Sequence, residues 1–392
     1  MTSSTAKLGE VADVVRGVTY SADDVSDGPK DGFLPILRAG NIGEELKIGN
    51  DLVWVPANLI RAAQKVRQND LVMCTSSGSA EVVGKLAKSP KDWDGSFGAF
   101  CAVVRSRNGK SDPAYLAHFL RSPSFKRWTK KSLGANIKNI RKSELEEFEV
   151  PSPPIIEQRR IAAILDKADS IQKKRREAIR LADDFLRSVF LDIFGGLLSG
   201  PTDQWQALST CTDFIDYRGK TPEKSDAGVR LITAKNVRDG VINVEPAEFI
   251  SEETYSWWMS RGYPQSGDVL FTTEAPLGNI AVLRTDEPIA IGQRLIAIRP
   301  REMLRSDYLS WALRQDVIQR DIFSRATGST VKGIRSAELV QVRVPIANYD
   351  DQLKFERIVA SVNHQKEVMH ASAAQGEQLF QALQQQAFQG QL

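Results

Sequence analysis

The chain has 392 residues, of which 42% are hydrophobic and 26% are charged, enough apolar material for two or three soluble domains. Its formal net charge of +3 excludes a histone-like basic chain, although a basic face for nucleic acid stays possible. Three scattered cysteines, an N-terminus without a signal-peptide core and the absence of any apolar run near 18 residues predict a cytoplasmic protein without disulfides or membrane spans.

The first 150 residues predict a mixed α/β domain. A helical stretch is expected at 113–130, and a junction with three prolines follows at 150–154, where a helix is disfavoured. Turns rich in Gly, Ser, Asn and Asp separate short β-rich runs. These runs lie at 34–37, 70–74 and 100–104.

Residues 157–194 predict a long helix with a heptad seam. Apolar or small side chains recur at alternating steps of four and three, and Gln172 and Arg175 fill two slots between them. The glycines at 195–196 predict its end. At about 1.5 Å per residue the helix would span roughly 57 Å, so its apolar stripe needs a partner helix. The expected seam residues are Ile161, Leu165, Ala168, Ile179, Leu186 and Val189.

The second half of the chain repeats the first. The clearest match joins residues 134–145 to 328–339, and Gly134 and Gly328 are 194 residues apart (328 − 134). The other elements follow in the same order, which is typical of a duplicated unit. They are β-rich runs at 268–271 and 295–298, a helical stretch at 307–325, a proline junction at 344–346 and a long helix at 352–388.

These elements predict an α+β fold. Two similar α/β domains in tandem are joined by two long helices, which pack as an antiparallel coiled coil because a whole domain lies between them. The expected boundaries are 1–150, 151–196, 197–345 and 346–392. The expected seam residues of the second helix are Ile358, Val362, Met369, Leu379 and Leu383.

No catalytic constellation is found in the sequence. It has neither a phosphate-binding loop nor a zinc-protease motif, and His118, His364 and His370 lie in predicted helices without suitable partners. Residues 152–155 (Ser-Pro-Pro-Ile) resemble an amino-methyltransferase motif, but Ile155 stands where an aromatic ring must stack on the flipped base. We therefore predict a chain that is not an enzyme and binds no metal or cofactor itself.

Residues 150–162, VPSPPIIEQRRIA, closely resemble the LPP-x-x-EQ-x-x-IA start of the conserved helical region in type I restriction–modification specificity subunits. Residues 328–335, followed by Glu338 and Leu339, and residues 267–271 are similar to segments of the recognition domains in that family. The resemblance covers the whole chain in its duplicated order. The second junction departs from the pattern, since it lacks the double proline and has Asp351-Gln352 in place of Glu-Gln.

The resemblance implies a DNA-specificity subunit that reads a bipartite site, one half with each recognition domain. The paired helices would act as a spacer and dock two methyltransferase subunits. The implied partners are double-stranded DNA, these methyltransferases and, for restriction, motor-nuclease subunits. S-adenosylmethionine is then expected on the methyltransferase partner and not on this chain.

Candidate DNA contacts are basic, amide and hydroxyl side chains close to predicted strand ends. A group kept in both copies, such as Asn41 with Asn236 or Lys138 with Lys332, cannot tell two half-sites apart, so structural or phosphate roles are expected for it. The loops that differ, 75–79 and 272–277, are better candidates for base reading. The full set is Arg38, Asn41, Thr75, Ser76, Ser77, Ser79, Asn136, Lys138, Lys235, Asn236, Thr272, Thr273, Glu274, Gln293, Arg294, Thr330 and Lys332.

Two other features stand out. The basic run at 173–176 lies in the first long helix, where a solvated face is favoured over a path for DNA. Of the adjacent Trp257 and Trp258, one ring is expected in the core and the other is a candidate for a subunit contact.

Two alternative functions stay open. The repeated modules are compatible with a protein–protein scaffold, which steep salt dependence of DNA binding would exclude. The chain also fits the specificity part of another restriction class, with methyltransferase and nuclease fused in one partner, and the partner's size distinguishes this case.

Overall fold

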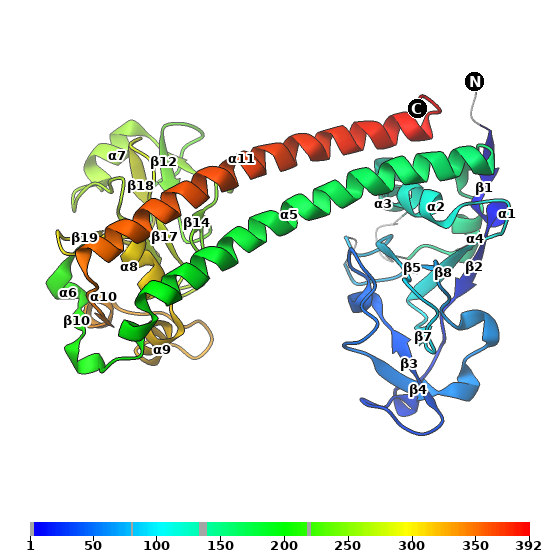
Figure 1. The fold of residues 1–392 in the computed structure, drawn as a ribbon, viewed down its shortest axis with the longest axis horizontal. Coiled ribbons are helices and arrows are strands. Elements are labelled where there is room, and N and C mark those ends of the chain that lie inside the picture. The colour runs from blue at the N-terminus through cyan, green and yellow to red at the C-terminus, as the bar shows by residue number, and fades with distance from the viewer. Residues whose placement is uncertain (1–3, 80, 133–138, 218–220) are drawn as a thin grey trace. The chain divides into compact units, whose positions relative to one another are not determined.

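The computed structural model describes residues 4–79, 81–132, 139–217 and 221–392, and it confirms the α+β fold with two α/β domains and two long helices (Figure 1). The contacts divide the chain into two compact units. Unit 1 is Met1–Glu177 with His370–Leu392, and unit 2 is Ala178–Met369. Each unit therefore holds one α/β domain and part of each long helix. The predicted four-part boundaries stay a prediction.

Unit 1 is built on an antiparallel sheet of order β2-β8-β5-β6. A smaller sheet of order β4-β3-β7 pairs β3 with β7 in parallel, and β1 pairs with β9. The strands are β1 (Thr5–Lys7), β2 (Ala12–Arg16), β3 (Phe33–Leu37), β4 (Val53–Pro56), β5 (Leu71–Cys74), β6 (Leu86–Lys88), β7 (Ser96–Phe97), β8 (Cys101–Ser106) and β9 (Glu149–Pro151), and the helices are α1 (Leu8–Val11), α2 (Pro113–Arg121), α3 (Pro123–Ser132), α4 (Lys142–Glu146) and the first part of α5 (Ile155–Leu198).

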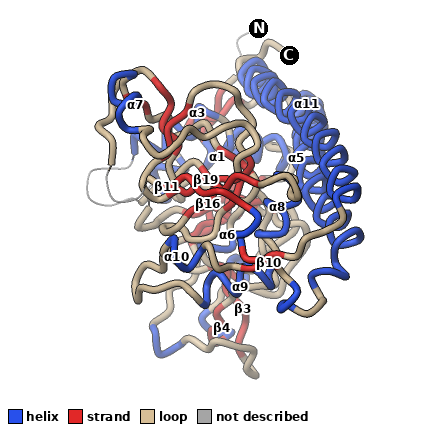
Figure 2. The backbone as a smooth tube through the Cα atoms, turned by 90° about the vertical axis from the view of Figure 1, so that its left-hand side faces the viewer, coloured by secondary structure: helices blue, strands red, loops and turns tan. Residues whose placement is uncertain are grey.

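Unit 2 repeats this topology. Its main sheet has the order β11-β19-β16-β17, its smaller sheet has the order β15-β12-β18 with β12 and β18 parallel, and β10 pairs with β20. Figure 2 shows α8 beside the β19 and β16 strands. The strands are β10 (Gln206–Ala207), β11 (Thr212–Asp216), β12 (Val229–Ile232), β13 (Val237–Arg238), β14 (Val241–Ile242), β15 (Phe249–Ile250), β16 (Val269–Thr272), β17 (Ile280–Val282), β18 (Ile289–Ile291), β19 (Leu295–Pro300) and β20 (Arg343–Val344), and the helices are α6 (Leu208–Cys211), α7 (Glu252–Trp258), α8 (Ser306–Leu313), α9 (Asp316–Ser324), α10 (Ser336–Leu339) and α11 (Tyr349–Phe388).

Both faces of the main sheet are covered, which explains the continuous apolar strands. In β5 all four residues are buried. Leu71 and Met73 belong to the core shared with α2 and α3, whereas Val72 and Cys74 belong to the core shared with the smaller sheet. A strand buried on both faces needs no polar alternation.

The helical stretch expected as one helix in each domain is in fact two helices. In unit 1, α2 ends before Ser122 and α3 starts at Pro123, whose ring cannot continue the preceding helix. In unit 2 no proline lies at the break. There the side-chain Nε2 of Gln319 donates to the carbonyl of Leu313 at 2.8 Å, which satisfies a free acceptor at the C-terminus of α8.

The predicted end of the first long helix at 195–196 is wrong. Helix α5 continues through both glycines to Leu198, where Leu198 packs against the core of unit 2. Glycine in a helix costs only about 1 kcal/mol relative to alanine, so apolar burial beyond the glycines offsets it. Among the described helices, none combines the length and apolar character needed to cross a bilayer.

The antiparallel packing of the two long helices is confirmed within each unit. In unit 2, Phe190 and Phe194 near the C-terminal end of α5 meet Phe355 near the start of α11, with ring centroids 5.2 and 5.7 Å apart. In unit 1, Ile161 and Leu165 near the start of α5 pack with a cluster from the end of α11. That cluster contains Phe380, Leu383 and Ala387.

The seam of the second helix needs one correction. Leu379 was expected in the seam, but its side chain is 71% exposed. The seam instead passes from Gly376 to Phe380, a step of four, and this step turns position 379 to solvent. The other predicted seam residues are buried or half-buried.

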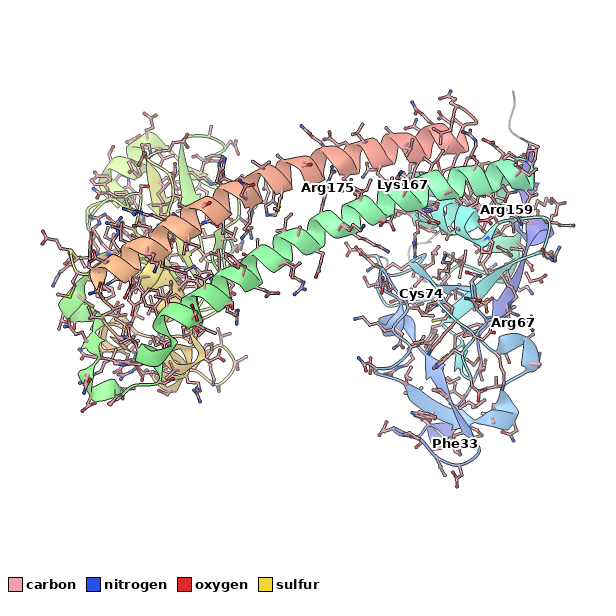
Figure 3. The ribbon with its side chains drawn as sticks, viewed as in Figure 1. Phe33, Arg67, Cys74, Arg159, Lys167 and Arg175 are labelled. Atoms are coloured by element: carbon pink, nitrogen blue, oxygen red, sulfur yellow. The ribbon has the colours of Figure 1, made fainter. Side chains whose placement is uncertain are left out.

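A polar layer interrupts the seam in unit 1. Arg175, labelled on α5 in Figure 3, donates from Nη1 to the carbonyl of Ser372 at 3.0 Å, and the neighbouring Gln172 is buried. A Cβ atom at Gly376 would collide with both side chains. Gln172 and Arg175 therefore fit at seam positions of the heptad pattern because Gly376 on the facing helix has no side chain.

A buried glutamine ties each long helix to its own domain. In unit 1, Gln158 accepts from the amide of Asp112 at 2.9 Å and donates to the carbonyls of Lys110 and Pro153. In unit 2, Gln352 makes the equivalent three bonds to Arg305, Met303 and Ala347. The three hydrogen bonds of its side-chain amide therefore explain why glutamine recurs at both junctions, whereas the acidic residue before it differs between them (Glu157 and Asp351).

We predict that Gln352→Leu lowers the free energy of unfolding by about 1–3 kcal/mol, because the partly buried Arg305 amide and Met303 carbonyl and the buried Ala347 carbonyl lose their partner. Urea denaturation followed by tryptophan fluorescence measures the change. The matched control is Gln385→Leu on the exposed face of the same helix, for which about 0.5 kcal/mol or less is expected. Equal losses in the two variants would contradict the role of the amide.

Candidate nucleic-acid interface

Each domain has a pocket at the same place in its fold, where the main sheet meets the segment before α4 or α10. The pocket of unit 1 has a volume of about 720 Å³ and is lined by Ser76, Phe100 and Arg141 among others. The pocket of unit 2 has a volume of about 440 Å³, and Glu274 and Arg335 belong to its lining. Exposed loop residues line both pockets, so a large ligand can reach them from solvent.

Matching backbone hydrogen bonds build the pocket of unit 1. The amide of Thr75, directly after β5, donates to the carbonyl of Phe100 at 2.9 Å. The amide of Ile140 donates to the carbonyl of Thr75 at 2.8 Å, and Ser76 forms an antiparallel bridge with Asn139. Three segments distant in sequence are thereby held together (Cys74, at the end of β5, is labelled in Figure 3).

Unit 2 has the same set of bonds. The amide of Thr273 donates to the carbonyl of Arg294 at 3.0 Å, and the amide of Ile334 donates to the carbonyl of Thr273 at 3.0 Å. Glu274 forms the antiparallel bridge, here with Gly333. Position 274 is therefore equivalent to 76, and 294 is equivalent to 100.

The side chains at these equivalent positions differ in chemistry. In unit 1 Phe100 is 69% exposed and Ser76 is partly buried. In unit 2 the Nε of Arg294 lies 2.9 Å from Oε1 of Glu274, and the two side chains are 49% and 45% exposed. Gln293, next to Arg294 in sequence, lines the pocket together with Glu274.

An exposed arginine recurs in both pockets. Arg141 directly precedes α4, and Arg335 directly precedes α10. Neither was among the predicted contacts, although both lie in the best-matched segment of the repeat. The repeated Ile-Arg pair was the available signal, since an exposed arginine without a buried structural role is suited to a phosphate.

A buried ion pair lies at the start of the central strand in each main sheet. Asp70 accepts two hydrogen bonds of 2.7 Å from Arg105, and Asp268 accepts two of 2.8 Å from Arg299. Both carboxylates are almost fully buried. These bidentate pairs fix the strands that lead into the pocket loops.

The two cysteines near the pocket of unit 1 are inert. Burial raises the pKa of Cys101 to about 12 and also raises the pKa of Cys74. Both thiols are therefore protonated at neutral pH and are not activated nucleophiles. The three cysteines of the described chain are all free and buried.

Five of the predicted DNA contacts have buried side chains, and their role as contacts stays a prediction. Asn41 accepts from the Arg38 amide at 2.7 Å and donates to the carbonyls of Lys47 and Asn50, and Asn236 makes equivalent bonds in unit 2. Their side-chain amides close a loop, which is the kind of structural role expected of a residue kept in both copies. The five buried residues are Asn41, Asn236, Thr75, Thr272 and Thr273.

The other predicted contacts stay predictions. Arg38 is exposed and forms an ion pair with Asp51, with Nη2 and Oδ1 2.8 Å apart. Lys235 is also exposed, and its Nζ lies 3.6 Å from Oε1 of Glu248. Asn136 and Lys138 lie outside the described residues. The remaining residues are partly or fully exposed, namely Ser76, Ser77, Ser79, Glu274, Gln293, Arg294, Thr330 and Lys332.

The basic run of α5 is largely engaged within unit 1. Lys173 lies 3.3 Å from Asp169, and Arg176 lies 3.3 Å from Glu44.

The tryptophan pair has one buried and one exposed ring. Trp258 is buried in the core of unit 2, as expected for one of the two, and Trp257 is exposed, so its subunit contact stays a prediction.

Of the three histidines, His118 is buried. Its Nε2 lies 2.7 Å from Asp166, and burial lowers its pKa against the effect of that carboxylate. Within the part of the chain that the structure describes, no group of His, Cys, Asp and Glu side chains has the arrangement of a metal site.

Comparisons with known proteins agree with this architecture. Residues 2–181 match the family model for the type I restriction modification DNA specificity domain. The chain belongs to the family of type I restriction–modification specificity subunits.

Three curated relatives are similar in sequence. The EcoKI specificity subunit of Escherichia coli (strain K12) is 31% identical over 68% of this chain, and the StySPI subunit of Salmonella potsdam is 35% identical over 50%. These matches span only 60% and 43% of the two relatives. The MjaVIII subunit of Methanocaldococcus jannaschii is 21% identical over 92% of this chain and 86% of its own length.

Two solved structures share the fold. A chain from a study of complex assembly and conformational transition in the type I R-M system covers 99% of this chain and 98% of its own length, with a TM-score of 0.55 and 19% identity. The type I S subunit from M. genitalium covers 98% of this chain and 96% of its own length, with a TM-score of 0.57 and 16% identity. The duplicated architecture thus extends over nearly the whole of both chains.

We predict that Asp70→Ala destabilises the protein by about 3–5 kcal/mol, because it leaves the Arg105 guanidinium largely buried without its carboxylate. Thermal or urea unfolding measures the loss. The control is Asp13→Ala, which removes the partner of Arg107 in an exposed pair on the same sheet, and about 0–1 kcal/mol is expected there. Similar losses for both variants would show that burial does not set the strength of the Asp70 pair.

Proposed function

We propose that this chain is the DNA-reading subunit of a type I restriction–modification complex and that each domain reads one half of a bipartite site. The observation that carries this proposal is the pair of equivalent pockets, which share a backbone framework and a repeated exposed arginine but differ at the loop positions. A repeated framework with different side chains is what two unlike half-sites require. A scaffold for proteins alone gives no reason for the repeated Arg141 and Arg335.

The paired helices are proposed to hold the two recognition domains apart and to dock two methyltransferase subunits, with motor-nuclease subunits joining for restriction. Exposed apolar side chains support a docking role. Leu181 and Phe185, one turn apart on α5, are both about half exposed. An uncovered apolar row on a helix is typical of a surface that another subunit covers.

The chain itself is proposed to be non-catalytic and to act in the cytoplasm. S-adenosylmethionine would bind the methyltransferase partner, which carries out the transfer. The protonated thiols at the pocket and the free cysteines support this assignment, because they offer no activated nucleophile and fit a reducing compartment.

The first test is methylation-aware sequencing of the host genome with and without the gene. We expect one gapped, two-part motif to lose its methylation when the gene is deleted, and the motif supplies both half-sites at once. An unchanged methylome, with the gene expressed, would contradict the proposal and favour the scaffold.

The spacer role predicts that the gap follows helix length. Deleting residues 172–178 together with 370–376 removes one heptad from each helix around the Arg175–Ser372 hydrogen bond, keeps the seam in phase and leaves Leu181 and Phe185 in place. Each helix loses about 10 Å, so the gap should shrink by about 3 base pairs while both half-sites stay the same. Methylome sequencing measures the gap, and an unaltered gap would contradict the spacer role.

A further inference from the structure

The sharpest difference between the two domains lies at one pair of equivalent positions. Ser76 and Phe100 in unit 1 occupy the places that Glu274 and Arg294 occupy in unit 2, as the shared backbone bonds establish. Ser76 and Phe100 line one pocket together with Arg141, and Glu274 lines the other together with Arg335. Side chains that differ at equivalent positions of the two domains can distinguish one DNA half-site from the other.

The Arg294–Glu274 pair is arranged for recognition more than for stability. Both side chains are about half exposed, and an ion pair of that kind contributes only about 0–1 kcal/mol to folding. The printed contact joins Nε of Arg294 to Oε1 of Glu274, and the guanidinium carries two further, terminal nitrogens. These nitrogens form a planar donor fork that the carboxylate holds in place.

The charge of Glu274 argues against a phosphate as the target of this pair. A carboxylate repels a phosphate, whereas it accepts a hydrogen bond well from an amino group. In the major groove, arginine donates to O6 and N7 of guanine, and glutamate accepts from N4 of cytosine. The pair therefore matches the two bases of one G·C pair.

The equivalent place in unit 1 has the opposite character. Phe100 is 69% exposed, although its carbonyl is fixed by the amides of Thr75 and Ser76. An exposed ring on a fixed backbone, without charge beside it at position 76, suits apolar contact. In the major groove the apolar group is the methyl of thymine.

We propose that Arg294 and Glu274 read one G·C pair in the half-site of unit 2, and that Phe100 reads an A·T pair through the thymine methyl in the half-site of unit 1. This inference rests on the proposed function. Arg141 and Arg335 hold phosphates beside these readers and carry no sequence information.

The test compares methylomes of hosts that carry the wild-type gene or single variants. Arg294→Gln should change one position of one half-site from G·C to A·T, because the glutamine amide pairs with N6 and N7 of adenine. Preference for the original base should fall by roughly 10- to 100-fold. Phe100→Ser should relax an A·T position in the other half-site only.

Arg335→Ala provides the matched comparison. We expect it to weaken methylation at all sites by a similar factor without changing any letter of the motif, as loss of a phosphate contact does. Arg294→Ala should make the G·C position degenerate. If alanine abolishes methylation altogether, glutamine should restore it with a changed letter.

The outcomes separate this inference from the proposed function. A wild-type strain without a gapped motif would overturn the proposed function itself. A gapped wild-type motif that Arg294→Gln leaves unchanged, or a loss of methylation that glutamine does not restore, would overturn only the base-reading role. A shared change of both half-sites by either variant would also overturn it, since each domain reads its own half.

Discussion

The structure depends on the buried amide at the start of each long helix. Gln158 and Gln352 each accept one backbone hydrogen bond and donate two, and their partners lie on the loop before α2 or α8 and on the proline junction. Among short side chains, a carboxamide alone offers this combination of donors and acceptor. It fixes the direction in which the helix leaves its own domain, so a rigid helix becomes a rigid extension of the domain.

The ends of the helices complete this arrangement. Phe194, near the end of α5, packs edge-on against Tyr308 in unit 2, and Phe388, near the end of α11, packs in the same way against Tyr115 in unit 1. Both tyrosines also donate to the carbonyl of the junction proline that precedes a helix. Each domain therefore holds the start of one helix and the end of the other, and the two halves of the chain are equivalent despite their order in sequence.

Sequence patterns predicted most of the fold because its strands and long helices are set by local periodicity and by the repeat. The errors arose where tertiary burial decides. The end of α5 was misplaced because packing of Leu198 outweighs the helix-breaking tendency of two glycines. Leu379 was misassigned because the seam of α11 steps by four residues from Gly376 to Phe380. Gly376 lies in the seam because it packs against Gln172 and Arg175 of the partner helix, which the sequence of α11 alone does not show.

The DNA-contact residues stay predictions, because the sequence does not show which polar side chains folding leaves exposed. Conspicuous polar residues such as Asn41 and Asn236 recur in both copies because their amides close the same loop, and this requirement buries them. The exposed Phe100 has no polar signature, and its position becomes informative only through its equivalence to Arg294. Recurrence in a duplicated chain thus marks scaffold or phosphate contact, and exposure distinguishes the two. Divergence at an exposed, backbone-fixed position marks the residues that can give two similar domains different targets.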